Sequence, residues 1–155
     1  MGVFICGLII GILIAGVVTW LLMPRMMLVV HKSRYSSVEE TCEQLKAAIE
    51  ANGWRCPAIR DMNMAMKEQG VEMERQVRIV ELCKANYAKD ILTTNPEVST
   101  LMPCAWGVYE GKDGNVYISG MNMGLMGKMF GGNIAKIMGL VSKDEKRILR
   151  DIIQE

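Results

Sequence analysis

Sulfur carries the most distinctive chemistry of this sequence, which contains five cysteines and fourteen methionines in 155 residues. Cys83 ends one expected strand and Cys104 precedes the next, so these two thiols are better placed for chemistry than Cys6, Cys42 and Cys56. If the two strands run antiparallel, both sulfurs lie at one end of the sheet. If the helix between them makes a parallel crossover, they lie at opposite ends. The alternative to a joint role is that each cysteine is simply a small apolar core residue.

A soft metal ion is the second chemistry to consider. Thiolate and thioether ligands select Cu(I), and Met121 and Met123 join Cys83 and Cys104 as candidate ligands. Methionine is also a flexible filler of protein cores, so we expect no cofactor and keep Cu(I) as the alternative. The cysteines form no CxxC pair, which indicates neither a zinc ribbon nor a disulfide framework.

Several ligand and reaction classes are disfavoured. His31 is the single histidine, which leaves little room for a Ser–His or Cys–His catalytic arrangement. The formal net charge of +1 lacks the basic excess that nucleic-acid binding requires. A phosphate-binding loop around Gly127 and Lys128 fails, because Asn122 and Met129 stand where that motif needs glycine and serine or threonine. We therefore expect neither nucleic acid nor a nucleotide as a ligand.

The segment 120–132 is unusually apolar and rich in glycine. Lys128 is the only charged residue of this segment, and its glycines weaken the preference for a regular structure. One interpretation, the safer one, is a backbone packed tightly beneath the last helices. The other is an apolar contact surface that lies on the membrane or on a partner. The side chains of that surface are Met123, Leu125, Met126, Met129 and Phe130.

The N-terminal stretch predicts where the protein sits. Residues 3–23 contain no charge, and a helix of that length spans roughly 30 Å, the thickness of the hydrocarbon core of a bilayer. A cleaved signal peptide does not fit, because the apolar stretch is too long and lacks a basic start and a small-residue cleavage site. We predict a transmembrane anchor helix over residues 1–24 and a soluble domain over residues 25–155, in a single-pass protein of the cell membrane.

The anchor also carries signals for packing and orientation. Gly7, Gly11 and Ala15 recur every four residues and share one helix face, which predicts close helix–helix packing in lipid. Small residues are also common in membrane helices in general, and this second interpretation stays open. Three basic residues follow the apolar stretch and none precedes it: Arg25, Lys32 and Arg34. This asymmetry favours the cytoplasmic face for the soluble domain.

The remaining residues predict alternating strands and helices. Ser37 and Glu40 form a capping box that begins an amphipathic helix, and Gly53 suits the position after its end. A second capping box at Ser142 and Glu145 predicts that a last helix begins there. The order is irregular, so we expect an α+β fold with a single, mostly antiparallel sheet packed with helices. The expected strands cover 28–35, 54–59, 77–83, 105–110 and 115–119, and the other helices cover 61–69, 85–95 and 134–141.

The order of these pieces resembles a family of bacterial and archaeal proteins, domain of unknown function 302 (DUF302). The resemblance rests on YSSVEET at 35–41, VELC at 80–83, LMPC at 101–104 and DGNVYIS at 113–119, and covers about residues 28 to 141. The tail GLMGKMFGG at 124–132 is similar to the membrane-anchored branch of the family. The resemblance implies a compact α+β domain that often self-associates and has no established reaction. It implies no role for any cysteine.

Two functions follow as expectations. The leading one is a membrane-tethered, non-catalytic interaction domain or accessory subunit, with the lipid bilayer, copies of itself or other membrane subunits as partners. The alternative is a thiol or soft-metal relay centred on Cys83 and Cys104. The relative position of Cys83 and Cys104 in the fold discriminates between these two functions.

Overall fold

A five-stranded antiparallel sheet forms the frame of the domain, as the α+β expectation requires. The computed structural model describes residues 2–154, with side chains from residue 10 onward. The strand order is β1-β5-β4-β3-β2, and every neighbouring pair is antiparallel. The strands are β1 (Leu28–Lys32), β2 (Ile59–Asp61), β3 (Val77–Leu82), β4 (Cys104–Glu110) and β5 (Val116–Met121). The helices are α1 (Gly2–Met27), α2 (Val38–Ala51), α3 (Met62–Lys67), α4 (Ala85–Thr94), η1 (Pro96–Leu101), α5 (Met123–Phe130) and α6 (Gly132–Leu149).

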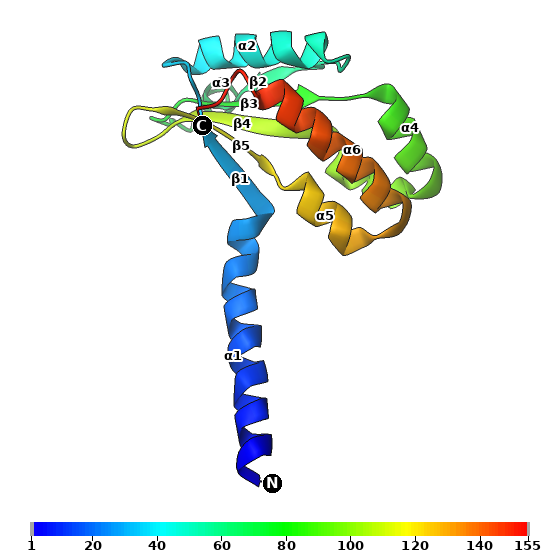
Figure 1. Cartoon of the computed structure of the whole chain (residues 1–155). Coiled ribbons are helices and arrows are strands. Elements are labelled where there is room, and N and C mark those ends of the chain that lie inside the picture. The colour runs from blue at the N-terminus through cyan, green and yellow to red at the C-terminus, as the bar shows by residue number, and fades with distance from the viewer. Residues whose placement is uncertain (1, 155) are drawn as a thin grey trace.

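The core lies between one face of this sheet and the helices. Burial alternates along β5, where Val116 and Ile118 are buried and their neighbours are partly exposed, as expected of a sheet with one covered face. Leu45 on α2 and Ile148 on α6 pack into the same core. Figure 1 shows α2 running above the sheet, α6 crossing it, and α4 and α5 grouped at one end.

Local capping signals place the shorter elements. The Ser37 side chain accepts a hydrogen bond from the Glu40 amide at 3.3 Å, and Gly53 follows α2 with a φ of 74°. The β4–β5 hairpin turns at Gly114, also at a φ of 74°. The second strand is shorter and later than predicted: β2 covers Ile59–Asp61, and Arg55 contributes only an isolated bridge to Cys83. β2 lies at one edge of the sheet, close to Pro57, where a residue without a backbone N–H is tolerated.

The C-terminal region forms one long helix where two were expected. The helix α6 runs without a break from Gly132 to Leu149, so the capping box at Ser142 does not begin a new helix. Ile137, Val141 and Ile148 are buried on one stripe of α6. Because that stripe continues across position 142, a break there would remove core contacts that a single cap cannot replace.

The segment 120–132 is also regular, which corrects the expectation of a weakly ordered stretch. Its first residues complete β5, and Asn122 then caps α5 by accepting a hydrogen bond from the Leu125 amide at 3.1 Å. The glycine at 127 serves close packing rather than flexibility. A Cβ at Gly127 would lie 3.0 Å from the Cβ of Met138, so glycine lets α5 approach α6.

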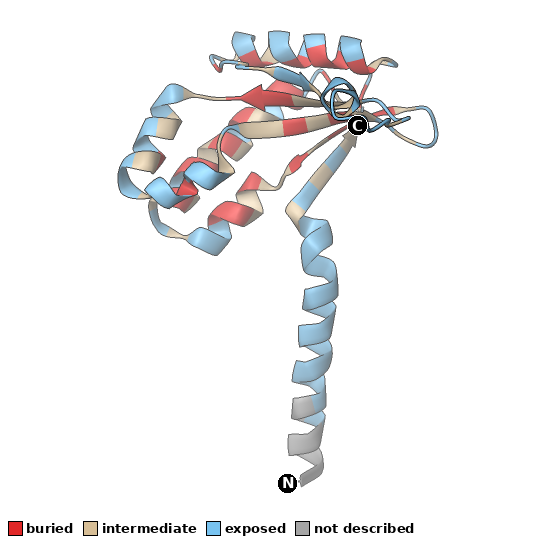
Figure 2. Cartoon of the chain, turned by 180° about the vertical axis from the view of Figure 1, so that it is seen from behind, coloured by how far each residue is buried: buried red, intermediate tan, exposed pale blue. Residues whose placement is uncertain are grey.

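The N-terminal helix projects from the domain as a long stalk (Figure 1). Its stretch Ile10–Met27 has a mean hydropathy of 1.8 and no buried residue, so α1 is long and apolar enough to cross a membrane. Figure 2 shows this exposure along the stalk. The helix continues through Pro24 to Met27, beyond the predicted end at residue 24. Asn122 explains the extension, because its backbone and side-chain N–H groups donate to the carbonyls of Met27 and Met26.

Candidate functional site

A cavity lies at the end of the sheet where β3 ends, β4 begins and β5 ends. The antiparallel order brings these three strand ends together, with Leu82 directly opposite Cys104. Residues of α4, η1, α5 and α6 close the space, which measures about 40 Å³. A single buried water needs roughly 10–15 Å³. The cavity therefore fits an ion or a few solvent molecules, whereas an organic ligand would require its walls to move.

Sulfur dominates the wall of this cavity. Seven of its seventeen lining residues carry sulfur, against 14 methionines and 5 cysteines in all 155 residues. The four residues that the sequence singled out are all among them. The full set, called here the sulfur cluster, is Cys83, Cys104, Met102, Met121, Met123, Met126 and Met138. The sequence did not indicate Met102 and Met138 as cavity residues, because only the fold brings η1 and α6 to this end of the sheet.

Burial keeps the thiol of Cys104 in its neutral form. Cys83 and Cys104 are both partly buried free cysteines. Burial raises the pKa of Cys104 to about 11, and the charges of Glu145 and Cys83 act in the same direction. A thiol with such a pKa is almost entirely protonated at neutral pH and is a slow nucleophile. Thiol exchange at Cys104 is therefore disfavoured, whereas a metal ion that displaces the proton is not.

A charged cluster borders the cavity from α4 and α6. Asp144 on α6 is buried, and its Oδ2 accepts hydrogen bonds from Lys84 Nζ at 2.8 Å and from Trp54 Nε1 at 3.1 Å. Arg147 also pairs with Asp144. Lys84 Nζ additionally lies 4.6 Å from the centre of the Tyr87 ring. Two cations share one carboxylate, so the cluster carries a net positive charge beside the sulfur cluster.

Burial and hydrogen bonding act on Asp144 in opposite directions. Burial alone raises the pKa of Asp144, but the hydrogen bonds from Lys84, Trp54 and Arg147 outweigh it and lower the pKa below its ordinary value. Among the residues that the structure describes, no cation pairs with the neighbouring Glu145. Burial raises the pKa of Glu145 to about 7, and a hydrogen bond from the Trp106 side chain offsets this only in part. No sequence signal indicates this difference between adjacent carboxylates, because it depends on packing.

The cavity adjoins the exit of α1. Asn122 donates to the Met27 carbonyl at 2.8 Å and to the Met26 carbonyl at 3.1 Å. Its neighbours in the chain, Met121 and Met123, both line the cavity. Figures 1 and 2 show α5 at the end of the domain nearest to α1. Asn122 therefore joins the predicted membrane helix to the wall of the cavity.

The expected contact surface divides into two parts. Met123 and Met126 are buried in the core, which corrects the expectation that they belong to an external surface. Leu125 is partly buried. Met129 and Phe130 are 55% and 52% exposed at the end of α5. Helical periodicity explains the exposure of Met129, which lies off the buried stripe of α5. Phe130 has the spacing of that stripe but is the last residue of the helix.

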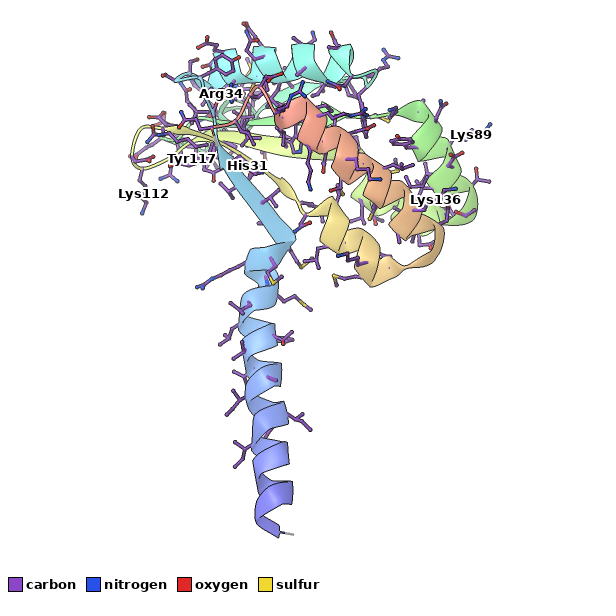
Figure 3. All side chains as sticks on the ribbon, viewed as in Figure 1. His31, Arg34, Lys89, Lys112, Tyr117 and Lys136 are labelled. Carbon is purple, nitrogen blue, oxygen red and sulfur yellow. The ribbon has the colours of Figure 1, made fainter. Side chains whose placement is uncertain are left out.

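The other residues considered in the sequence lie away from the cavity. His31 lies on β1 opposite Ile118, and Figure 3 shows it on the side of the domain away from α4. On the stalk, a Cβ added at Gly7 or Gly11 would meet no atom within 4 Å, and Ala15 is exposed on the same helix. The three small residues are therefore free for packing, which stays a prediction.

Comparisons with known proteins agree with this architecture. The family model described as domain of unknown function DUF302 matches residues 29–155. A crystal structure of an uncharacterized conserved protein DUF302 from Bacillus stearothermophilus is 21% identical, with a TM-score of 0.72 over 81% of this chain and 98% of that one. That likeness concerns the fold. A comparison with curated proteins finds no match.

Proposed function

We propose, starting from the fact that the chain belongs to the DUF302 family, that this protein is a membrane-tethered, non-catalytic interaction domain. In this proposal α1 spans the cell membrane as an uncleaved anchor of the membrane-anchored branch of the family. The domain then associates with a second copy of itself, or with another subunit, beside the membrane. The basic residues Arg25, Lys32 and Arg34 favour the cytoplasmic side for the domain.

The observation that carries the proposal is an exposed apolar pair on the helix that begins at the junction with the anchor. Met129 and Phe130 are more than half exposed on α5, the helix that Asn122 connects to the end of α1. This pair is called the contact surface below. A domain held at the bilayer needs little additional ordering to bring such a surface against a neighbouring membrane subunit.

The anchor supports the same proposal independently. Gly7, Gly11 and Ala15 lie on one face of α1, where small side chains allow two helices to pack closely in lipid. Leucine at position 11 would hold the helices apart. Leucine at position 16 is a matched control, because Gly16 lies about 140° around the helix from Gly11.

The test is the oligomeric mass of the full chain in mild detergent, with cross-linking in native membranes. Gly11→Leu and the double variant Met129→Asp, Phe130→Asp are each expected to reduce association. Gly16→Leu and Met64→Asp should leave it unchanged, since Met64 is exposed on α3, outside the contact surface. A wild-type chain that is monomeric in both experiments and cross-links to no other subunit would refute the proposed function.

A second candidate function has one specific observation in its favour. The thiol or soft-metal relay required Cys83 and Cys104 at one end of the sheet, and both residues line the same cavity. The raised pKa of Cys104 disfavours the thiol-exchange form of this function. The soft-metal form remains as the stronger version.

A further inference from the structure

We propose that the face of the sheet opposite α2 and α6 lies against the lipid bilayer, beside the point where α1 leaves it. This face is called the open face below. The proposal rests on the membrane anchor of the proposed function, but it does not depend on association between chains. Its support comes from the composition of the open face, from the exposure of its first strand and from its position next to α1.

The helices α2 and α6 cover the other face of the sheet. Val80, Trp106 and Ile118 are buried on that covered face and share one core with residues of both helices. Side chains alternate between the two faces along a strand, so the residues on either side of these three are directed to the open face. In Figure 1, α2 lies on the side of the sheet away from α1. The open face is therefore turned toward the side from which the stalk projects.

The open face lacks the polar side chains of an ordinary solvated sheet, which alternate with apolar ones along each strand. Of the described side chains that β1 and β5 direct to this face, Lys32 alone is charged. The others are Leu28, Val30, Tyr117, Ser119 and Met121. Farther from α1, on β3, the charge of Glu81 is paired with Arg60 on β2. An exposed face with so little charge has the composition of a contact surface.

The most exposed apolar side chains of the open face are those nearest to the anchor. Leu28 and Val30 are 57% and 52% exposed, and Met26 in the last turn of α1 is 55% exposed. Little more than one helical turn separates Leu28 from Met23, the end of the uncharged stretch, which is about 7 Å along the helix axis. In a bilayer that α1 spans, Leu28 then lies in the headgroup layer. Because no linker separates α1 from β1, contact between this strand and lipid costs little additional ordering.

The tyrosines and the lysine of the open face fit a lipid surface as its partner. Tyr109 and Tyr117 stack with their ring centres 5.9 Å apart, and tyrosine rings gather at the interface between membrane and water. The charges of Lys112 and Asp113 at the hairpin tip offset each other, so Lys32 supplies the positive charge that meets anionic headgroups. Figure 3 shows Lys112 and Tyr117 on the side of the hairpin from which the stalk projects. Membrane helices tilt by about 20° on average, and a tilt of α1 toward the open face brings the hairpin to the headgroups.

The test places a photo-crosslinking benzophenone amino acid at one position of the full chain, reconstituted in nanodiscs of phosphatidylcholine and phosphatidylglycerol. Illumination should give lipid adducts at positions 30 and 117, measured by peptide mass spectrometry. Position 43 is the matched control and should give no adduct above background, because Glu43 is exposed on α2, beyond the covered face. With the probe at 117, the double variant Leu28→Asp, Val30→Asp should lose the lipid adducts. The double variant Ala47→Asp, Ala51→Asp should keep them, since both alanines are exposed on α2.

The outcomes decide between lipid and a protein partner. Circular dichroism establishes that each variant is folded; if the variant with aspartate at 28 and 30 does not fold, the comparison of positions 30 and 117 with position 43 decides. Lipid adducts at 30 and 117 that are no more frequent than at 43, or adducts to a second copy of the chain in their place, would overturn the proposal. Extraction with alkaline carbonate tests the anchor separately: release of the chain would refute both the anchor and this surface. Lipid adducts are counted whatever the oligomeric state, so failure here is distinguishable from failure of the interaction function.

Discussion

Glu145 makes the stability of the domain depend on pH, with a sign that follows from its burial. Burial raises the pKa of Glu145 from its ordinary value of 4.5 to about 7 in the folded protein. Below pH 4.5 the carboxyl is protonated in both states. Between these values the unfolded chain loses the proton while the folded chain keeps it, so stability falls as the pH rises. Above pH 7 both states are ionised and the loss is complete.

The size of the effect follows from the two pKa values. They differ by about 2.5 pH units, and each unit corresponds to about 1.36 kcal/mol, so the free energy of unfolding should decrease by about 3 kcal/mol between pH 4.5 and pH 7. Glu145→Gln keeps the size of the side chain and an acceptor for Trp106, but it cannot ionise. We therefore expect this variant to be more stable than wild type at pH 8 and nearly equal to it at pH 4.5.

Urea unfolding of the full chain in mild detergent, followed by tryptophan fluorescence, measures this difference at a series of pH values. Glu68→Gln is the matched control, because Glu68 is exposed and should reproduce the wild-type dependence. Asp144 does not interfere, since its lowered pKa gives stability that is lost only in more acidic solution. Parallel curves for wild type and Glu145→Gln from pH 4.5 to pH 8 would refute the reasoning.

Three further predictions concern the same region. Asp144→Ala leaves Lys84 and the Trp54 N–H without their buried partner and should reduce the free energy of unfolding by about 3–5 kcal/mol, whereas Asp144→Asn should reduce it less. Urea unfolding at pH 7 compares the two variants. A loss for Asp144→Ala smaller than that of a substitution at an exposed position would contradict the role of the cluster. Gly127→Val should cost about 1–3 kcal/mol by separating α5 from α6, which thermal unfolding measures; an unchanged melting temperature would show that the two helices are not closely packed there. Cys104 should react slowly with maleimide at pH 8, and its labelling rate should rise toward pH 11, because its pKa is about 11. Peptide mass spectrometry measures the labelling, and rapid labelling at pH 7 would contradict this prediction.

Local features of the fold were predictable because their causes are local. The Ser37 cap and the turn at Gly114 depend on residues within a few positions of each other, and both occur where the sequence places them. The capping box at Ser142 shows the limit of this reasoning. The same local pattern occurs there inside a continuous helix, because the buried stripe of α6 extends across it. Burial of this stripe therefore outweighs the local capping signal at Ser142.

The candidate site was predictable only in part, for a related reason. The sequence singled out Cys83, Cys104, Met121 and Met123 and made their meeting conditional on antiparallel strands, and the pairing of β3 with β4 fulfils that condition. Glu145 was not found as a perturbed acid, because nothing in its neighbourhood in sequence distinguishes it from an exposed helical glutamate. Its burial is decided by contacts that α6 makes with the sheet.

Asn122 helps to hold α1 in a fixed orientation relative to the domain. The chain passes from Met27 directly into Leu28 of β1, so no flexible linker separates α1 from the sheet. Asn122 additionally ties the last carbonyls of α1 to the first turn of α5. A twist or tilt of α1 would therefore act on the strand end that carries Met121 along two paths, the pairing of Leu28 with Met121 and the hydrogen bonds of Asn122. If α1 spans the membrane as proposed, forces in the bilayer would reach the wall of the cavity along both.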